Sequence, residues 1–185
     1  MQHVKIPQDR VGVLIGEGGE TMREIERKAE VRLEIDSENA SVGIDQVGDP
    51  VRGLKGSDIV RAIGRGFAPE EALALLDDDL MQLEVIDVKR TARNKNDLKR
   101  RKGRLIGKDG RTRELMEELT GASVVIYGST LATIGMPRQV EIVRSAAEML
   151  LDGAPHGAVY SFLERKRREQ LNPAAIEYHE LEDAD

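Results

Sequence analysis

Two glycine-bounded turns, Gly16–Gly19 and Gly107–Gly110, carry the residue pattern in this chain that is best suited to holding a ligand. Glycine has no Cβ, so another chain can approach its backbone closely, and a positive φ costs it nothing. When a helix follows such a turn, its first N–H groups and the positive end of its dipole attract phosphate. The second turn adds Lys108, Arg111 and Arg113 as nearby cations. The expected chemistry is therefore non-covalent binding of a phosphate backbone.

Other phosphate-binding and catalytic patterns do not fit. A P-loop requires G-x-x-x-x-G-K-[ST], but Lys102 stands where its first glycine would be and Asp109 follows the lysine. The dinucleotide pattern G-x-G-x-x-G does not occur, and the chain has no cysteine for a thiolate site. His3, His156 and His179 lack metal-ligand spacing. We expect no enzyme activity, no metal, no cofactor and no small-molecule substrate.

The two turns belong to a longer internal repeat. Residues 11–36 and 102–127 align at an offset of 91 without a gap, and the identities concentrate around Leu-Ile-Gly-x-x-Gly. The repeat is too long for a solenoid unit and suits a small domain, so it predicts two copies of one domain. The coinciding positions are Gly12/Gly103, Leu14/Leu105, Ile15/Ile106, Gly16/Gly107, Gly19/Gly110, Thr21/Thr112, Glu26/Glu117 and Ile35/Ile126.

Each copy has to hold its turn between secondary-structure elements, and apolar periodicity predicts the same order in both. A strand and a short helix precede the turn, and a helix, two strands and a last helix follow it. The fold class is therefore α+β, with the order β-α-α-β-β-α twice, each copy forming a small antiparallel sheet with helices on one face. The strands are predicted at residues 4–6, 31–35, 40–47, 83–88, 124–127 and 131–135.

Two helices are predicted outside the repeat. Pro69, at a first helical position, begins an extra helix that runs through Leu76. Val159, Phe162 and Leu163 form the apolar stripe of a C-terminal helix. The predicted organisation is a first domain at 1–78, a second at 79–153, the C-terminal helix at 154–171 and an acidic, disordered tail at 172–185.

The charge of the chain is distributed unevenly. The net charge is −6, but Lys89–Arg113 holds twelve lysines and arginines against two acids, a local net charge of +10. A local field of this sign favours a polyanionic partner more than the total charge opposes one. A solvated surface segment is the plain alternative. No apolar run reaches membrane-spanning length, so we expect a cytoplasmic protein without a membrane partner.

The doubled Leu-Ile-Gly-x-x-Gly between two helices resembles type I KH domains, which clamp four nucleotides across such a loop. The whole chain, roughly 1–171, is similar to archaeal tandem-KH proteins related to the eukaryotic partner-of-Nob, a ribosome assembly factor. Besides the two loops, the resemblance rests on Ala62–Phe67 with the Pro-Glu-Glu-Ala-Leu helix that follows, and on Tyr127-Gly128 leading into Thr133–Gly135.

This resemblance implies that the chain binds single-stranded small-subunit ribosomal RNA near its 3′ end. It also implies a second partner, the endonuclease that matures this end, which the chain would help to position without cutting RNA. In the second copy, Ile106 and the strand Val124–Ile126 would form the floor of the base groove. The expected RNA-binding residues are Arg100, Arg101, Arg104, Ile106, Gly107, Lys108, Asp109, Gly110, Arg111 and Arg113, with Gly16, Gly18 and Gly19 in the first copy.

The first copy departs from the family pattern at Glu17, whose carboxylate would repel a phosphate. Its turn could also be a plain connector between helices, and RNA contact by the first domain is in doubt. A protein-interaction scaffold that uses this degenerate domain is the alternative function.

Overall fold

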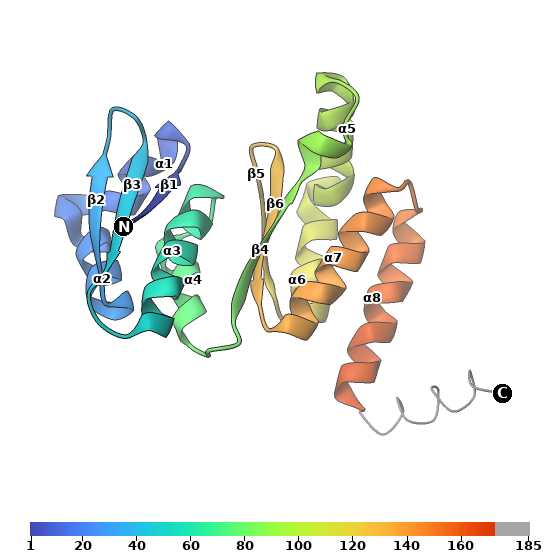
Figure 1. Ribbon diagram of the computed structural model, residues 1–185. Coiled ribbons are helices and arrows are strands. Elements are labelled where there is room, and N and C mark those ends of the chain that lie inside the picture. Colours follow the sequence, from blue (N-terminus) through green and yellow to red (C-terminus); the bar gives the residue numbers. More distant parts are fainter. Residues whose placement is uncertain (173–185) are drawn as a thin grey trace.

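The computed structural model describes residues 1–172, which form two α+β units side by side (Figure 1). The predicted order of elements is confirmed in both units. The first unit consists of β1 (Gln2–Lys5), α1 (Gln8–Ile15), α2 (Glu20–Ala29), β2 (Val31–Asp36), β3 (Ser41–Gln46) and α3 (Pro50–Gly64). The second consists of β4 (Gln82–Asp87), α5 (Lys95–Ile106), α6 (Arg111–Thr120), β5 (Ser123–Tyr127), β6 (Thr130–Gly135) and α7 (Pro137–Leu151).

Each unit contains one antiparallel three-stranded sheet, with strand order β1-β3-β2 in the first and β4-β6-β5 in the second. The central strand of each sheet is thus the last in sequence, and β2 and β5 are free edges next to the glycine turns. A glutamate holds each of these edge strands to the helix before it. Glu26 accepts a hydrogen bond from the N–H of Leu33, and Glu117 accepts one from the N–H of Val124, both at 2.9 Å.

The two helices predicted outside the repeat are also present. Helix α4 (Pro69–Leu73) begins at its proline and continues as a 3₁₀ turn over Ala74–Leu76. Helix α8 (His156–Leu171) buries Val159 and Leu163 against α6 and α7. Of the predicted acidic tail, only Asn172 is described, and the rest lies outside the described residues.

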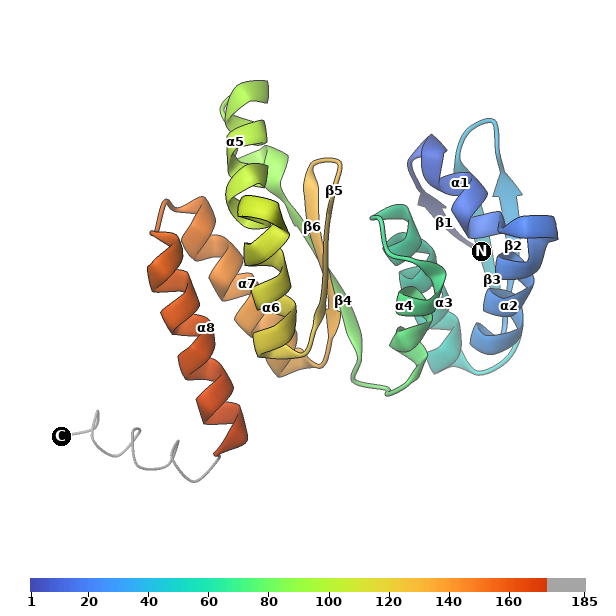
Figure 2. The same ribbon diagram turned by 180° about the vertical axis from the view of Figure 1, so that it is seen from behind.

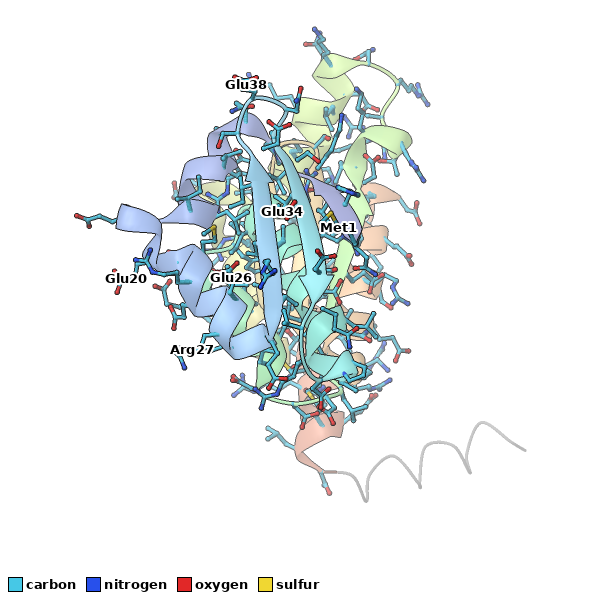
Figure 3. The ribbon with its side chains drawn as sticks, turned by 60° about the vertical axis from the view of Figure 1, so that its left-hand side comes forward. Met1, Glu20, Glu26, Arg27, Glu34 and Glu38 are labelled. Carbon is cyan, nitrogen blue, oxygen red and sulfur yellow. The ribbon has the colours of Figure 1, made fainter. Side chains whose placement is uncertain are left out.

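The two sheets are covered differently. The outer face of the first sheet is open and carries charged side chains such as Glu34 (Figure 3). The second sheet lies between α3 and α4 on one side and α6 and α7 on the other, a layering that the view from behind also shows (Figure 2). Ala132 and Ile134 of β6 therefore pack in the core of the first unit. Because both of its faces are covered, β6 is buried at every position, whereas burial alternates along β2.

The junction between the units is built on the stretch Ala62–Phe67 at the end of α3. Gly66 has a φ of +107°, and a Cβ there would lie 2.8 Å from the Cβ of Tyr127 in the second unit. A Cβ on Gly64 would lie 2.6 Å from Ile6, so this glycine is required for close packing against β1. Both glycines are thus fixed by packing.

Arg10 completes this junction. Its guanidinium donates hydrogen bonds to the carbonyl oxygens of Ile63 at 2.7 Å and Phe67 at 2.8 Å, which lie at the end of α3. The same group stacks over the Tyr127 ring, 5.6 Å from its centroid. The Tyr127 hydroxyl donates a hydrogen bond to Asp9. Helix α1 of the first unit therefore holds the tip of the β5–β6 hairpin of the second.

Candidate nucleic-acid interface

The two glycine turns have the same backbone conformation. Gly16 has φ 73° and ψ 176°, and Gly107 has φ 77° and ψ 173°. At the third position, Gly18 has a φ of 58° and Asp109 a φ of 54°. Aspartate is one of the few other residues that tolerate this left-handed conformation. Both copies therefore retain the same turn geometry.

The first glycine of each turn is required by a threonine in the following helix. A Cβ on Gly107 would collide with the hydroxyl of Thr112, and one on Gly16 would collide with that of Thr21. In the second unit, the Thr112 hydroxyl forms a hydrogen bond of 2.8 Å with the Tyr160 hydroxyl of α8. The C-terminal helix therefore supports the second turn from behind.

The two turns differ in the surroundings of the last glycine and in the residues between the first and the last glycine. Beside Gly110 there is open space, but the Arg23 guanidinium lies 3.0 Å from the place of a Cβ on Gly19 and covers it. Lys108 is exposed in the second turn, and the equally exposed Glu17 occupies the same position in the first. The second turn thus presents an exposed lysine, whereas the first presents an exposed glutamate and has Arg23 beside its last glycine.

The apolar surface beside the second turn is smaller than predicted. Ile106 is half-buried and contributes to neither core, whereas its counterpart Ile15 packs against the core of the first unit. Val124 and Ile126 face the helices of their own unit. Val125 points to the other side of the sheet and packs beside the first unit, so its assignment to the groove floor is wrong.

Gly103 is a candidate site residue that the sequence interpretation missed. It lies on the same face of α5 as Ile106 and Gly107, is exposed, and has no atom within 4 Å of the place of its Cβ. A glycine inside a helix costs about 0.5–1 kcal/mol relative to alanine, and no packing within residues 1–172 requires this one. Its match with Gly12 in the repeat was the available signal. We infer that the position is kept clear for a ligand.

Two of the expected RNA-binding arginines have a structural role. Arg101 donates to the carbonyl oxygen of Leu151 at 2.9 Å, and Arg104 donates to that of Leu150 at 3.1 Å, both at the end of α7. Arg10, the counterpart of Arg101 in the repeat, makes the same contact at the end of α3. Cations at these positions donate hydrogen bonds to carbonyl oxygens that lack a partner within the helix, and they interact favourably with the negative end of the helix dipole. The two arginines therefore position α5 and are not free for phosphate.

The other expected cations differ in availability. Arg100 pairs with Asp97 at 2.7 Å, and Arg113 pairs with Glu117 at 2.9 Å. Arg111 has only long contacts, 3.7 and 3.8 Å, with two exposed glutamates. Within residues 1–172, the ammonium group of Lys108 has neither a hydrogen bond nor an ion pair. Lys108 and Arg111 are thus the cations of the second turn best placed for a ligand.

Asp97 organises the beginning of α5. It accepts a hydrogen bond from the backbone N–H of Arg93 and contacts the guanidinium groups of Arg100 and Arg101. These contacts hold the pKa of Asp97 well below its ordinary value. The carboxylate therefore stays charged and keeps both arginines in place. Figure 1 shows α5 projecting past the end of the β5–β6 hairpin, so its basic first turns are accessible.

Comparison with known protein families agrees with this architecture. A model described as KH domain matches residues 1–78, and one described as eukaryotic type KH domain (KH-domain type I) matches residues 82–168. KH domain-containing protein MJ0443 of Methanocaldococcus jannaschii is 50% identical over 167 residues, which are 89% of this chain and 73% of that protein. The chain belongs to the tandem KH-domain family.

Comparison with solved structures and with fungal proteins shows which members of the tandem KH family this chain resembles. Dim2p from Pyrococcus horikoshii OT3 is 47% identical, with a TM-score of 0.83 over 89% of this chain and 98% of that one. The aDim2p structure from the same organism in complex with a/eIF2alpha and rRNA is 46% identical, with a TM-score of 0.84 over 91% and 94% of the two chains. Pre-rRNA-processing protein PNO1 of Candida albicans is 31% identical over 138 residues, 74% of this chain and half of that protein. The predicted relation to partner-of-Nob proteins is confirmed.

Two further observations concern the residues that the structure describes. None of their helices is long and apolar enough to cross a membrane. In the same part of the chain, no group of three or more His, Cys, Asp or Glu side chains is arranged to hold a metal ion.

Proposed function

We propose that this tandem KH protein binds RNA during assembly of the small ribosomal subunit, and that its second KH domain holds single-stranded pre-rRNA near the 3′ end. The observation that carries this proposal is the contrast between the two turns. Lys108 is exposed at the second turn and there is open space beside Gly110, whereas the first turn exposes Glu17 and has the Arg23 guanidinium beside Gly19. The rRNA in the aDim2p complex and the name of the PNO1 proteins support the choice of RNA.

The second turn would hold the RNA backbone, and the groove beside it would hold bases. Phosphates would lie against the N–H groups at the start of α6, with Lys108 as the mobile cation. Bases would cover the exposed part of Ile106 and approach α5 at Gly103. Four of the five aromatic residues are described, and all four lie outside the two turns. Specificity would therefore come from base edges over aliphatic side chains rather than from stacking.

The first KH domain is a candidate protein-binding module, in which case the chain would link RNA to a protein partner. The arrangement of Glu17 and Arg23 at the first turn favours this second function. A maturation endonuclease, positioned near the RNA 3′ end by this domain, is the partner that we propose. The chain itself would supply binding and no cleavage chemistry.

The experiment that tests RNA binding reverses the charge of Lys108. We expect Lys108→Asp to weaken binding of a short single strand from the small-subunit rRNA 3′ end about tenfold or more, a change of about 1.4 kcal/mol per factor of ten. Fluorescence anisotropy at fixed salt measures the affinity. Arg27→Asp makes the same charge change on α2 and should have little effect. Equal affinity of folded Lys108→Asp and wild type would exclude this loop as the RNA site.

A further inference from the structure

The stretch Ala62–Phe67 contains one residue that the junction does not explain. Its first two residues and Phe67 are buried in the core, and its glycines pack against β1 and Tyr127. Arg65 is only half-buried, and within residues 1–172 its guanidinium forms no hydrogen bond or ion pair. The rest of the stretch thus fixes the backbone at a place from which one unpaired cation projects.

Arg65 lines a cavity of about 280 Å³ between the two KH domains. Lys5 of β1 and Arg61 of α3 line it from the first domain, and Val85 and Asp87 of β4 line it from the second. A single water molecule occupies about 30 Å³ of liquid, so this cavity can admit a larger group. Neither domain forms it alone.

The charge in this cleft is positive once pairing is taken into account. Asp87, the acid in its lining, contacts Arg90 at 3.4 Å. Arg61 contacts Asp58 at 3.4 Å, outside the lining. The other two cations, on β1 and just past the end of α3, have no partner in the described part of the chain. Two uncompensated cations therefore remain in a concave site, where their field is focused.

We propose that this cleft is a second RNA site, in which Arg65 and Lys5 bind a backbone phosphate. Guanidinium groups match phosphate oxygens in a bidentate manner, and the lysine supplies a point charge. RNA is favoured over an acidic peptide because the lining strand β4 leads directly into the basic segment Lys89–Arg113, which ends at the second glycine turn. The cleft thus lies at one end of the same basic segment.

The cleft and the groove lie at opposite edges of the second sheet, because β4 and β5 are its two edge strands. A strand that fills the groove alone runs along β5 and leaves the cleft empty. A longer, folded RNA can contact both edges. This inference rests on the proposed function, but it concerns different residues and a different length of RNA, so the two can fail separately.

The test compares two RNAs on the double variant Lys5→Ala/Arg65→Ala. A six-nucleotide strand should bind it as tightly as it binds wild type. A folded transcript of the small-subunit rRNA 3′ region should bind about tenfold more weakly, and the slope of log K against log salt should fall by about 0.7–0.9 for each phosphate that the variant no longer neutralises. Arg27→Ala/Arg32→Ala removes two exposed cations elsewhere and serves as the control. Thermal unfolding checks that the variants are folded.

If Lys5→Ala/Arg65→Ala binds the folded transcript as tightly as wild type does, the cleft proposal is overturned. The affinity of Lys108→Asp for the six-nucleotide strand would then show separately whether the second glycine turn binds RNA. Equal losses for both RNAs would also overturn the cleft proposal, because the cleft would then not be a separate site. Binding of a polyglutamate peptide that depends on Arg65, without any effect on the transcript, would assign the cleft to a protein.

Direct contact can be measured because the chain has no cysteine. A thiol-linked photo-crosslinker on Arg65→Cys should crosslink to the folded transcript and not to the six-nucleotide strand. The same label on Glu34→Cys, on the open face of the first sheet (Figure 3), should crosslink to neither. Absence of a crosslink from position 65 to the transcript would contradict the proposed site.

Discussion

The hydroxyl groups of Thr112 and Tyr160 lie 2.8 Å apart and join α6 to α8 directly behind the second glycine turn. His156, one turn earlier on α8, places its Nε2 3.0 Å from the carbonyl oxygen of Arg104 at the end of α5. Helix α8 therefore contacts the elements on both sides of the turn. The first KH domain has Thr21 at the equivalent place, but within residues 1–172 its hydroxyl forms no hydrogen bond to the helix that follows this domain, α4. The support given by α8 is specific to the domain proposed to bind RNA.

Removing the Tyr160 hydroxyl should loosen this support. Tyr160→Phe should lower the free energy of unfolding by about 0.5–1.5 kcal/mol, the usual contribution of one hydrogen bond. We expect a several-fold loss of affinity for the short single strand, since the turn is less fixed before binding. Denaturant unfolding and anisotropy titration measure the two effects. Tyr127→Phe removes the junction hydroxyl and should affect stability alone. An unchanged RNA affinity for folded Tyr160→Phe would show that α8 does not preorganise the turn.

Gly103 offers a test in which stability and binding move in opposite directions. Gly103→Ala should stabilise the fold by about 0.5–1 kcal/mol, because a helical glycine is replaced and nothing inside the chain is in the way. The methyl group should obstruct the ligand and weaken RNA binding about tenfold. Gly12→Ala, its counterpart in the first domain, should give the same stabilisation with no change in binding. If both variants bind equally well, Gly103 does not lie at the RNA interface.

The basic residues of α5 and of the second turn should separate into two classes. Arg101→Ala removes a hydrogen bond to a helix end and should cost about 1.5–3 kcal/mol of stability, the range for bonds that involve a charged group. It should leave the salt dependence of RNA binding nearly unchanged. Neutralising Lys108 and Arg111 together should cost little stability and reduce the salt slope by about 1.4, at about 0.7 per phosphate on a single strand. If Arg101→Ala reduced the salt slope without lowering stability, Arg101 would instead be assigned to RNA binding.

The fold could be predicted well because the residue pattern of each element occurs twice in the sequence. Matching positions such as Glu26 and Glu117 make the same hydrogen bond to the next strand in both units. The charge run around α5 was less informative, since a cation that binds phosphate and one that neutralises a helix end look alike in sequence. Arg104 and its acceptor Leu150 are 46 residues apart, a contact that only the folded chain shows.

The groove floor was overestimated for a related reason. The strand Ser123–Tyr127 is apolar on both faces because the first unit covers one of them, and periodicity alone does not say which face meets a ligand. Val125 was therefore assigned to RNA although it packs beside Gly66.

The central claim is that the second KH domain reads unpaired bases in its groove. The most direct measurement titrates the protein, at one fixed salt concentration, with a short single strand from the small-subunit rRNA 3′ end, with the duplex of the same sequence and with a scrambled strand. Base edges are available to an aliphatic groove only when they are unpaired, so the native single strand should bind most tightly and the duplex most weakly. A duplex that binds as tightly as the single strand would contradict the account and leave a basic surface without base recognition.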